Sequence, residues 1–181
     1  HLLDALREGA LDAALLSLPI PADTLEVITL FDEPFRLIAP AASPILRHER
    51  LSPAHLAASE MVLLEEGHCL RGQALALCGR RGQPSPRLVT TSLETLKYLV
   101  AAGEGYSLLP LTSSAIPQDL ANLVVVRAFD ARPPSRRIAL CFRRSAPDPA
   151  ALRALASFIR RHRPPGSLDV QPGPAPGTTT A

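Results

Sequence analysis

The sequence is poor in net charge, in cysteine and in long hydrophobic runs. Its formal net charge is only +2 over 181 residues, which gives no strong electrostatic attraction to nucleic acid. No continuous apolar run reaches about 20 residues and no signal peptide is evident, so neither a membrane span nor secretion is expected. Three cysteines, an odd number, argue against a secreted disulfide framework and favour a reducing cytoplasm.

What the sequence does contain is an alternation of strand-like and helix-like segments. The hydrophobic fraction is 46%, a balance typical of one large globular domain or two small lobes. Strands that alternate with helices predict an α/β fold with a parallel-rich sheet. The expected strands are 11–18, one or two within 25–40, 61–64, 87–91, 106–110, 123–129 and 137–142. The expected helices are 1–9, one that begins at Ser52 and Pro53, 69–78, 92–102 and 148–162.

The central stretch, residues 61–82, places two cysteines on one predicted helix. Cys69 would lie in its first turn and Cys78 in its last, before Gly79 and Gly82 stop it. Nine residues of α-helix separate the two by roughly 13 Å of rise and about half a turn. A disulfide needs Cα atoms within about 7 Å, so the pair joins only if the helix unwinds. The spacing therefore indicates a redox switch rather than a permanent structural disulfide.

The neighbours of the two cysteines predict different reactivities. Cys69 would meet the free N–H groups of a helix N-terminus and the cationic side chains of His68 and Arg71, which stabilise a thiolate. Cys78 follows an apolar run and is expected to be buried and weakly nucleophilic. Cys69 would thus be the sensing sulfur and Cys78 the resolving one. The alternative from residue statistics alone is that both are ordinary buried cysteines.

Four segments carry a resemblance to a known family. They are Gly67 to Arg71 (GHCLR) with the second cysteine nine residues after the first, FDEPFRLIAP from Phe31, TSLETLKYLVAAGEGYSLLP from Thr91, and RRIALCFRR from Arg136. Together they resemble the sensor domains of LysR-type transcriptional regulators over about Leu2 to Arg163. The cysteine pair in its GHCLR context resembles the peroxide-sensing branch of that family.

The resemblance implies a two-lobed fold like that of periplasmic binding proteins. Lobe I would comprise residues 1–29 and 138–163, with its first strand missing, and lobe II residues 30–137, with the redox segment 65–82. The winged helix-turn-helix that reads DNA in this family would lie upstream of the chain. Residues 164–181, rich in Pro, Gly and Thr, are expected to be a disordered tail.

The resemblance also implies a set of site residues around the redox pair. The expected environment of peroxide and thiolate is Gly67, His68, Arg71 and Arg136, and the expected cleft-lining hydroxyls are Thr91 and Ser92. His68 has the alternative of an exposed turn histidine, and Arg136 that of a solvated arginine at a strand end. Ser92 has the alternative of a helix cap.

Neither a metal nor a cofactor is expected at this site. The histidines and cysteines form no close metal-ligand spacing, and no catalytic residue is assigned. Cys141 is expected to be a structural core thiol without a sensing role.

The resemblance implies stoichiometric signalling rather than enzymatic turnover. Hydrogen peroxide would oxidise Cys69 to a sulfenic acid, Cys78 would close the disulfide, and the refolded segment would change how protomers pack in a homodimer or homotetramer. The upstream domains would then act as an activator on promoter DNA and RNA polymerase. Gly72, within the helix, would make the reduced form easier to melt.

Three other functions remain open from the residues. The first is a LysR-type sensor domain for a small organic effector, in which the cysteines are incidental. The second is a thiol peroxidase, against which stands the absence of a CxxC motif. The third is a solute-binding protein of the same architecture, which would normally carry an export signal.

Overall fold

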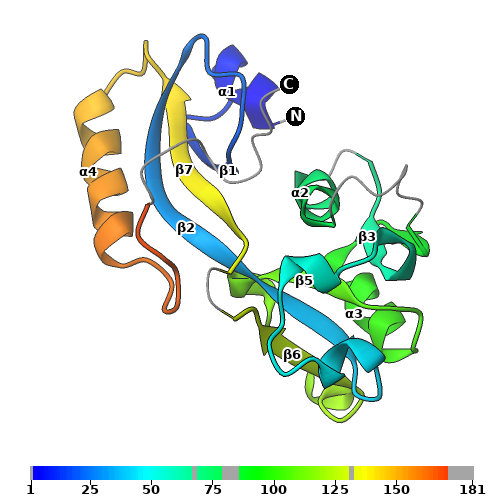
Figure 1. Ribbon diagram of the computed structural model, residues 1–181. Coiled ribbons are helices and arrows are strands. Elements are labelled where there is room, and N and C mark those ends of the chain that lie inside the picture. Colours follow the sequence, from blue (N-terminus) through cyan, green and yellow to red (C-terminus); the bar gives the residue numbers. More distant parts are fainter. Residues whose placement is uncertain (1, 67–68, 79–85, 131–132, 171–181) are drawn as a thin grey trace. The chain divides into compact units, whose positions relative to one another are not determined.

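The computed structural model describes residues 2–66, 69–78, 86–130 and 133–170 (Figure 1). The chain divides into two compact units: unit 1 contains residues 1–33 and 135–181, and unit 2 contains residues 34–134. The lobe limits taken from the family resemblance stay a prediction. Among the described residues, no helix combines the length and the apolar character that a membrane crossing requires.

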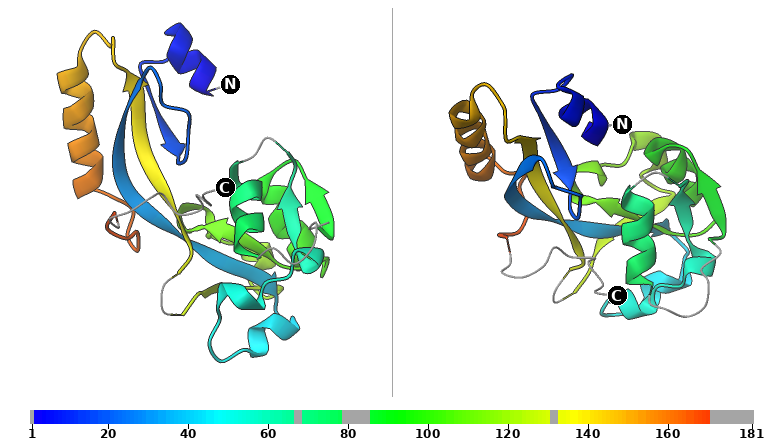
Figure 2. Two further views of the ribbon diagram at one scale, coloured as in Figure 1. Left: turned by 45° about the horizontal axis from the view of Figure 1, so that its top comes forward. Right: turned by 90° about the horizontal axis from the view of Figure 1, so that it is seen from above.

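Unit 1 is a sheet covered by a helix on each face. Strand β1 (Ala13–Ser17) pairs antiparallel with β7 (Ser135–Arg143), with Ala13 opposite Phe142 and Ser17 opposite Ile138, and β7 lies beside β2 (Leu25–Pro40). Figures 1 and 2 show α4 (Pro149–Arg161) along one side of this sheet and α1 (Leu2–Glu8) on the other. The strands and helices expected from the sequence for this unit are thereby confirmed apart from end residues.

Alternation along β7 builds the two cores of unit 1. Leu140 and Phe142 belong to the cluster that packs against α4, whereas Ala139 and Cys141 belong to the cluster that packs against α1. Successive side chains of a strand point to opposite faces, so one apolar strand serves both helices. A fully apolar run in β7 is therefore a consequence of its position between two covered faces.

Helix α4 has the ends that its sequence predicts. The Asp148 carboxylate accepts a hydrogen bond from the Ala151 backbone N–H at 2.9 Å, and Pro149 occupies the first turn, where its missing N–H costs nothing. Arg160 and Arg161 lie in the last turn, where positive charge suits the helix dipole.

The segment after α4 differs from the expected disorder. Residues 164–170 lie within the described structure, and Leu168 forms an antiparallel bridge with Asp32 of β2. The two backbone hydrogen bonds of this bridge measure 3.0 and 2.8 Å. The Pro, Gly and Thr content of the tail predicted disorder for residues 164–170 as well. The tail is ordered here because an edge of β2 offers unpaired backbone groups, which the sequence of the tail does not reveal. Residues 171–181 lie outside the described residues.

Unit 2 is built on the second half of β2, which lies between two antiparallel partners. β5 (Ser107–Pro110) pairs with it along Phe35–Ile38, and β6 (Val124–Ala128) pairs with it along Arg36–Pro40. β3 (Val62–Leu64) and β4 (Leu88–Thr90) form a parallel pair, and a parallel bridge joins Met61 to Tyr106 beside β5. The expectation of a parallel-rich sheet is therefore wrong for the long strands and right for the β3–β4 pair.

Two α-helices and several short 3₁₀ turns complete unit 2. The α-helices are α2 (Cys69–Leu77) and α3 (Leu93–Ala101). The 3₁₀ turns are η1 (Pro44–Arg47), η2 (Pro53–His55), η3 (Ala58–Glu60), η4 (Leu111–Ser113) and η5 (Gln118–Leu120). The helix expected to begin at Ser52 is thus a single 3₁₀ turn, because Leu56 already has extended backbone angles.

Gly105 lets two backbone segments of unit 2 meet. It has φ +135°, and a Cβ atom built on it would lie 2.3 Å from the Glu60 carbonyl oxygen. The next residue, Tyr106, donates its N–H to that same carbonyl at 3.1 Å, and its own carbonyl accepts from Val62 N–H at 2.9 Å. Only glycine combines this φ with this close approach.

We predict that Gly105→Ala lowers the free energy of unfolding by about 2 kcal/mol or more, because backbone strain and a main-chain clash add together. The matched control is Gly103→Ala, where φ is +86° but no atom lies within 4 Å of the added methyl group. This control is expected to lose about 1 kcal/mol. Urea unfolding of both variants measures the difference, and equal losses would contradict the role of the Glu60 contact.

Candidate functional site

Helix α2 begins at one of the two predicted redox cysteines and ends just before the other. Cys69 is its first residue, and Cys78 follows its last residue, Leu77. The prediction had placed Cys78 inside the last turn and the end of the helix at Gly79 or Gly82. The observed end is earlier, because the Cys78 N–H bonds to the Leu75 carbonyl at 3.1 Å in a tighter turn.

Both sulfur atoms are free thiols in this structure. They are nine positions apart in sequence, and nine steps along an α-helix advance roughly 13 Å. The largest Cα separation that a disulfide tolerates is about 7 Å. The intact helix α2 therefore keeps the two cysteines apart.

Cys69 is exposed at the start of α2. Glu65 and Glu66 are exposed in the turn between β3 and α2. Arg71 donates from Nη1 to the Leu64 carbonyl at 3.0 Å, so its guanidinium spans the turn that carries Cys69. Gly67 and His68, the other predicted members of this environment, lie outside the described residues. Cys69 is thus the more exposed of the two predicted redox cysteines.

Cys78 is half-buried against the core of unit 2. Its Sγ lies 3.2 Å from the Met61 Sδ and 3.4 Å from the Ala74 carbonyl oxygen, and either atom can accept the single thiol hydrogen. Burial raises the pKa of the Cys78 thiol above its ordinary value. Cys78 is therefore held as a neutral thiol, a poor nucleophile until it moves.

Cys78 also satisfies the C-terminal end of α2. The last four carbonyls of an α-helix have no partner within the helix. The Cys78 N–H binds the Leu75 carbonyl and its Sγ binds the Ala74 carbonyl. Movement of Cys78 toward Cys69 would remove both contacts, so release of the thiol and unwinding of the helix end are coupled.

The predicted cleft hydroxyls follow the strand next to β3. β3 and β4 run parallel, with Leu64 opposite Thr90, and the Glu65 N–H extends the pairing to the Thr90 carbonyl at 3.0 Å. The carboxyl ends of parallel strands meet at one edge of a sheet. Thr91 and Ser92 follow β4 there, at the same edge as the turn that leads to Cys69.

Ser92 also has the capping role that was its alternative. Its side-chain oxygen accepts from the Thr95 N–H at 3.1 Å and thereby caps α3. Thr91, the residue before it, is exposed. Their lining of a cleft stays a prediction.

Arg136 belongs to unit 1 and makes an ion pair there. Its Nε donates to the Glu33 carboxylate at 2.7 Å, and only 2% of the Glu33 side chain is exposed. The next residue, Arg137, binds the buried Asp32 carboxylate through two nitrogens at 2.8 and 3.1 Å. Arg136 is thus not the solvated arginine of the alternative interpretation, and its predicted role near the sensing sulfur stays a prediction.

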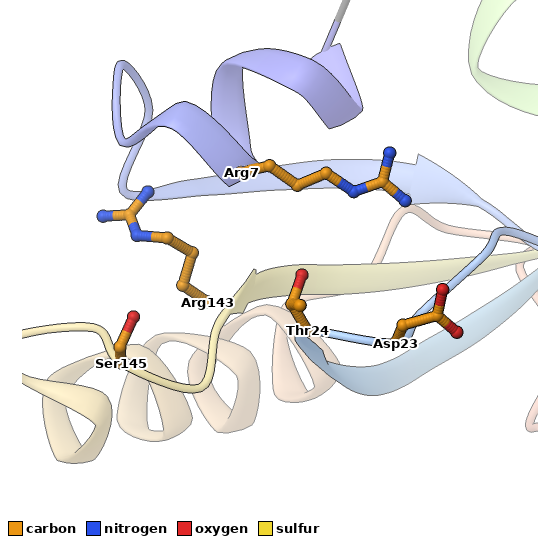
Figure 3. A pocket seen from close by; sticks show the side chains of 5 residues that line it. All are labelled: Arg7, Asp23, Thr24, Arg143 and Ser145. Atoms are coloured by element: carbon orange, nitrogen blue, oxygen red, sulfur yellow. The ribbon is translucent and has the colours of Figure 1, made fainter.

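A cavity of about 590 Å³ lies in unit 1, and no predicted site residue lines it. It is lined by Arg7, Asp23, Thr24, Arg143 and Ser145. Figure 3 shows the two guanidinium groups pointing away from each other. Arg143 donates from Nη1 to the Leu6 and Leu11 carbonyls at 2.6 and 2.8 Å, and it thereby fixes the end of α1. The cavity therefore lacks a convergent pair of cations for an anionic ligand.

Cys141 has the structural position that was expected for it. It is fully buried in β7, and burial raises the pKa of its thiol to about 11. Across residues 2–66, 69–78, 86–130 and 133–170, no three His, Cys, Asp or Glu side chains gather into a group that would hold a metal ion.

We predict a pH effect from Cys141. Because the folded state favours the neutral thiol, its contribution to stability is complete below about pH 9, the ordinary pKa, and is lost as pH approaches about 11. The difference in free energy of unfolding between the wild type and Cys141→Ala should fall over that range. Urea unfolding at a series of pH values measures it, and a constant difference would contradict the buried neutral thiol.

Met61, which contacts the Cys78 thiol, is a site residue that the sequence did not predict. Met61 and Cys78 are seventeen residues apart and belong to different elements. Nothing in the local pattern joins them, and the only available signal is that Met61 is the single methionine of the chain.

The chain has close relatives among known regulators. It is 38% identical over 161 residues to a probable hydrogen peroxide-inducible genes activator of Mycobacterium leprae, covering 88% of this chain and 51% of the relative. It is 37% identical over 162 residues to the DNA-binding transcriptional dual regulator OxyR of Escherichia coli K12, covering 88% and 52%. The chain thus spans about half the length of these curated relatives.

The fold matches a solved regulatory domain. The reduced form of the OxyR regulatory domain from Pseudomonas aeruginosa superposes with a TM-score of 0.75 at 36% identity, covering 88% of this chain and 77% of that one. The family model of the LysR substrate binding domain matches residues 1–164. The matched residues include every described helix and strand, and the chain therefore belongs to the LysR substrate-binding domain family.

Proposed function

We propose that this chain is the hydrogen-peroxide-sensing regulatory domain of a LysR-type transcriptional regulator. It signals through a reversible disulfide between Cys69 and Cys78. The observation that carries the proposal is a pair of free thiols held at the two ends of one intact helix, the first exposed and the second half-buried. The names of the relatives, which refer to hydrogen peroxide and to OxyR, support peroxide as the signal.

The chemistry needs only the two thiols and the oxidant. The Cys69 thiolate attacks one oxygen of hydrogen peroxide, the O–O bond breaks, and the leaving hydroxide takes a proton to become water. The Cys69 sulfur is now a sulfenic acid. The Cys78 sulfur attacks it, the S–O bond breaks, and the hydroxide leaves with the Cys78 proton as a second water. Two thiols and one peroxide thus give one disulfide and two waters, and a cellular dithiol reverses the step.

The disulfide cannot form on the helix described above. Helix α2 must unwind between Cys69 and Cys78, and the Cys78 contacts to Leu75 and Ala74 must break. Oxidation is therefore transmitted as a change of backbone conformation in the segment 65–82. This is a switch in which a local covalent change biases a two-state element.

The surrounding residues have proposed roles at the sulfur. Gly67 and His68 would shape the approach to Cys69, and Arg71 would supply positive charge from its place across the turn. Thr91 and Ser92 would add hydroxyls from the end of β4, and Arg136 would contribute a second cation. These roles rest on the family resemblance and, for Arg71, Thr91, Ser92 and Arg136, also on the position of each residue in its own unit.

The whole regulator would act through partners of the refolded domain. A homodimer or homotetramer would repack when the redox segment changes shape, and its DNA-binding domains would contact promoter DNA and RNA polymerase as an activator in the cytoplasm. Each event consumes one peroxide per site and leaves a signal, so the function is stoichiometric sensing rather than enzymatic catalysis.

We predict that one equivalent of hydrogen peroxide links Cys69 to Cys78 and leaves Cys141 reduced. Peptide mass spectrometry measures the linkage. The matched control is Cys78→Ser, in which the Cys69 sulfenic acid should persist and react with a dimedone probe. Two free thiols after peroxide treatment would favour a sensor for a small organic effector. Continuous peroxide consumption with a dithiol would favour a thiol peroxidase.

We predict that Gly72→Ala makes the disulfide harder to form. Gly72 is exposed in α2 and an added methyl group meets no atom within 4 Å, so alanine stabilises the helical, reduced state by up to about 1 kcal/mol. The reduction potential should rise by about 20 mV.

The reverse change provides the control for this prediction. Ala76, exposed in the same helix, is replaced by glycine, and the reduction potential should fall by about 20 mV. Equilibration in a series of dithiol redox buffers measures both variants. Shifts in the same direction would show that helix stability does not control the disulfide.

A further inference from the structure

The sulfur of Met61 is the closest described partner of the Cys78 thiol. The Sγ to Sδ distance is 3.2 Å, shorter than the 3.4 Å from the same Sγ to the Ala74 carbonyl oxygen. Met61 is fully buried, whereas Cys78 is only half-buried. A thioether is a weak acceptor and a thiol a weak donor, so the contact is a weak hydrogen bond between two polarizable sulfurs.

The Met61 backbone is held from three directions. Its N–H donates to the Ala58 carbonyl at 3.0 Å, its carbonyl accepts from the Arg87 N–H at 3.0 Å, and it forms a parallel bridge with Tyr106. The Tyr106 hydroxyl in turn accepts from the Ala57 N–H at 2.7 Å. Met61 is therefore a fixed anchor, and Cys78 is the partner that can leave.

The surroundings of Cys78 favour the thiol over the thiolate. The two atoms that face its Sγ, the Met61 sulfur and the Ala74 oxygen, are acceptors, and both carry negative partial charge. Burial raises the pKa of the Tyr106 hydroxyl in the same core to about 12, so ionised groups are disfavoured there. A thiolate formed at this place would be repelled by its neighbours.

We propose that Met61 is a positioning residue that retains the Cys78 thiol against the core of unit 2 in the reduced state. The Met61 sulfur sets the fraction of time for which Cys78 is released from the core and can attack the oxidised Cys69 sulfur. The effect on signalling rests on the proposed disulfide function. The contact between Met61 and Cys78 belongs to the reduced chain and does not depend on that function. Removal of the Met61 sulfur should expose Cys78 more often without disturbing the core.

The single methionine of the chain allows this test to be made at one atom. Expression of the Cys69→Ser variant with norleucine in place of methionine exchanges the Met61 sulfur for a methylene group, apart from any initiator residue, and keeps the side-chain length. The alkylation rate of Cys78 by iodoacetamide, followed by peptide mass spectrometry without peroxide, should rise two- to fivefold. This estimate reflects the loss of one weak hydrogen bond. The thermal midpoint should stay unchanged.

A control separates retention from general loosening of the core. Val124→Ala shortens a buried side chain in β6, which pairs with β2 rather than with β3. It should lower the thermal midpoint and leave the Cys78 alkylation rate close to that of the methionine form. An unchanged rate in the norleucine protein, or an equal rise in Val124→Ala, would overturn the proposal.

A second measurement links retention to signalling. In the chain with both cysteines, norleucine should accelerate closure of the disulfide after peroxide by the same factor as the alkylation. If norleucine accelerates alkylation but the methionine form makes no disulfide after peroxide, the proposed function is refuted. The retention of Cys78 by Met61 is then still supported. Acceleration of neither reaction, with the disulfide still forming, would refute the retention alone.

Discussion

The regular geometry of one short helix is the constraint on which the candidate site depends. As long as α2 runs from Cys69 to Leu77, the thiols at its ends are separated by more than a disulfide can span. The Cys78 thiol and N–H also stabilise the end of that helix through the Ala74 and Leu75 carbonyls. Cys78 is therefore both the resolving thiol and the residue that stabilises the helix end, so the redox state is coupled to the backbone conformation.

The frame of unit 2 explains why only one end of the helix is exposed to oxidant. β3 leads from the buried Met61 to the exposed turn at Glu65 and Glu66, so the chain emerges from the core just before Cys69. The helix then returns Cys78 to the Met61 sulfur. Gly105 permits the close approach of Tyr106 to the Glu60 carbonyl. This contact fixes the backbone at the start of β3, the strand that leads to Cys69.

Unit 1 shows how neighbouring residues of one strand can serve different purposes. Along β7, Arg136 and Arg137 neutralise the two buried acids of β2, Glu33 and Asp32, whereas Cys141 only fills space beneath α1. A buried carboxylate requires such a partner because its desolvation is costly. The sequence motif RRIALCFRR therefore combines ion pairs with a packed core, and a cysteine within it needs no redox role.

The sequence by itself determined the elements that depend on local signals. The Ser92 cap, the helix over 148–162 and the spacing of the two cysteines were predicted, because each rests on residues close to one another in the chain. Only the tertiary structure decided the antiparallel pairing of β2, the bridge of Leu168 to Asp32 and the contact of Met61 with Cys78. These join segments far apart in the chain, and their partners are chosen by packing and by unpaired backbone groups that no local pattern records.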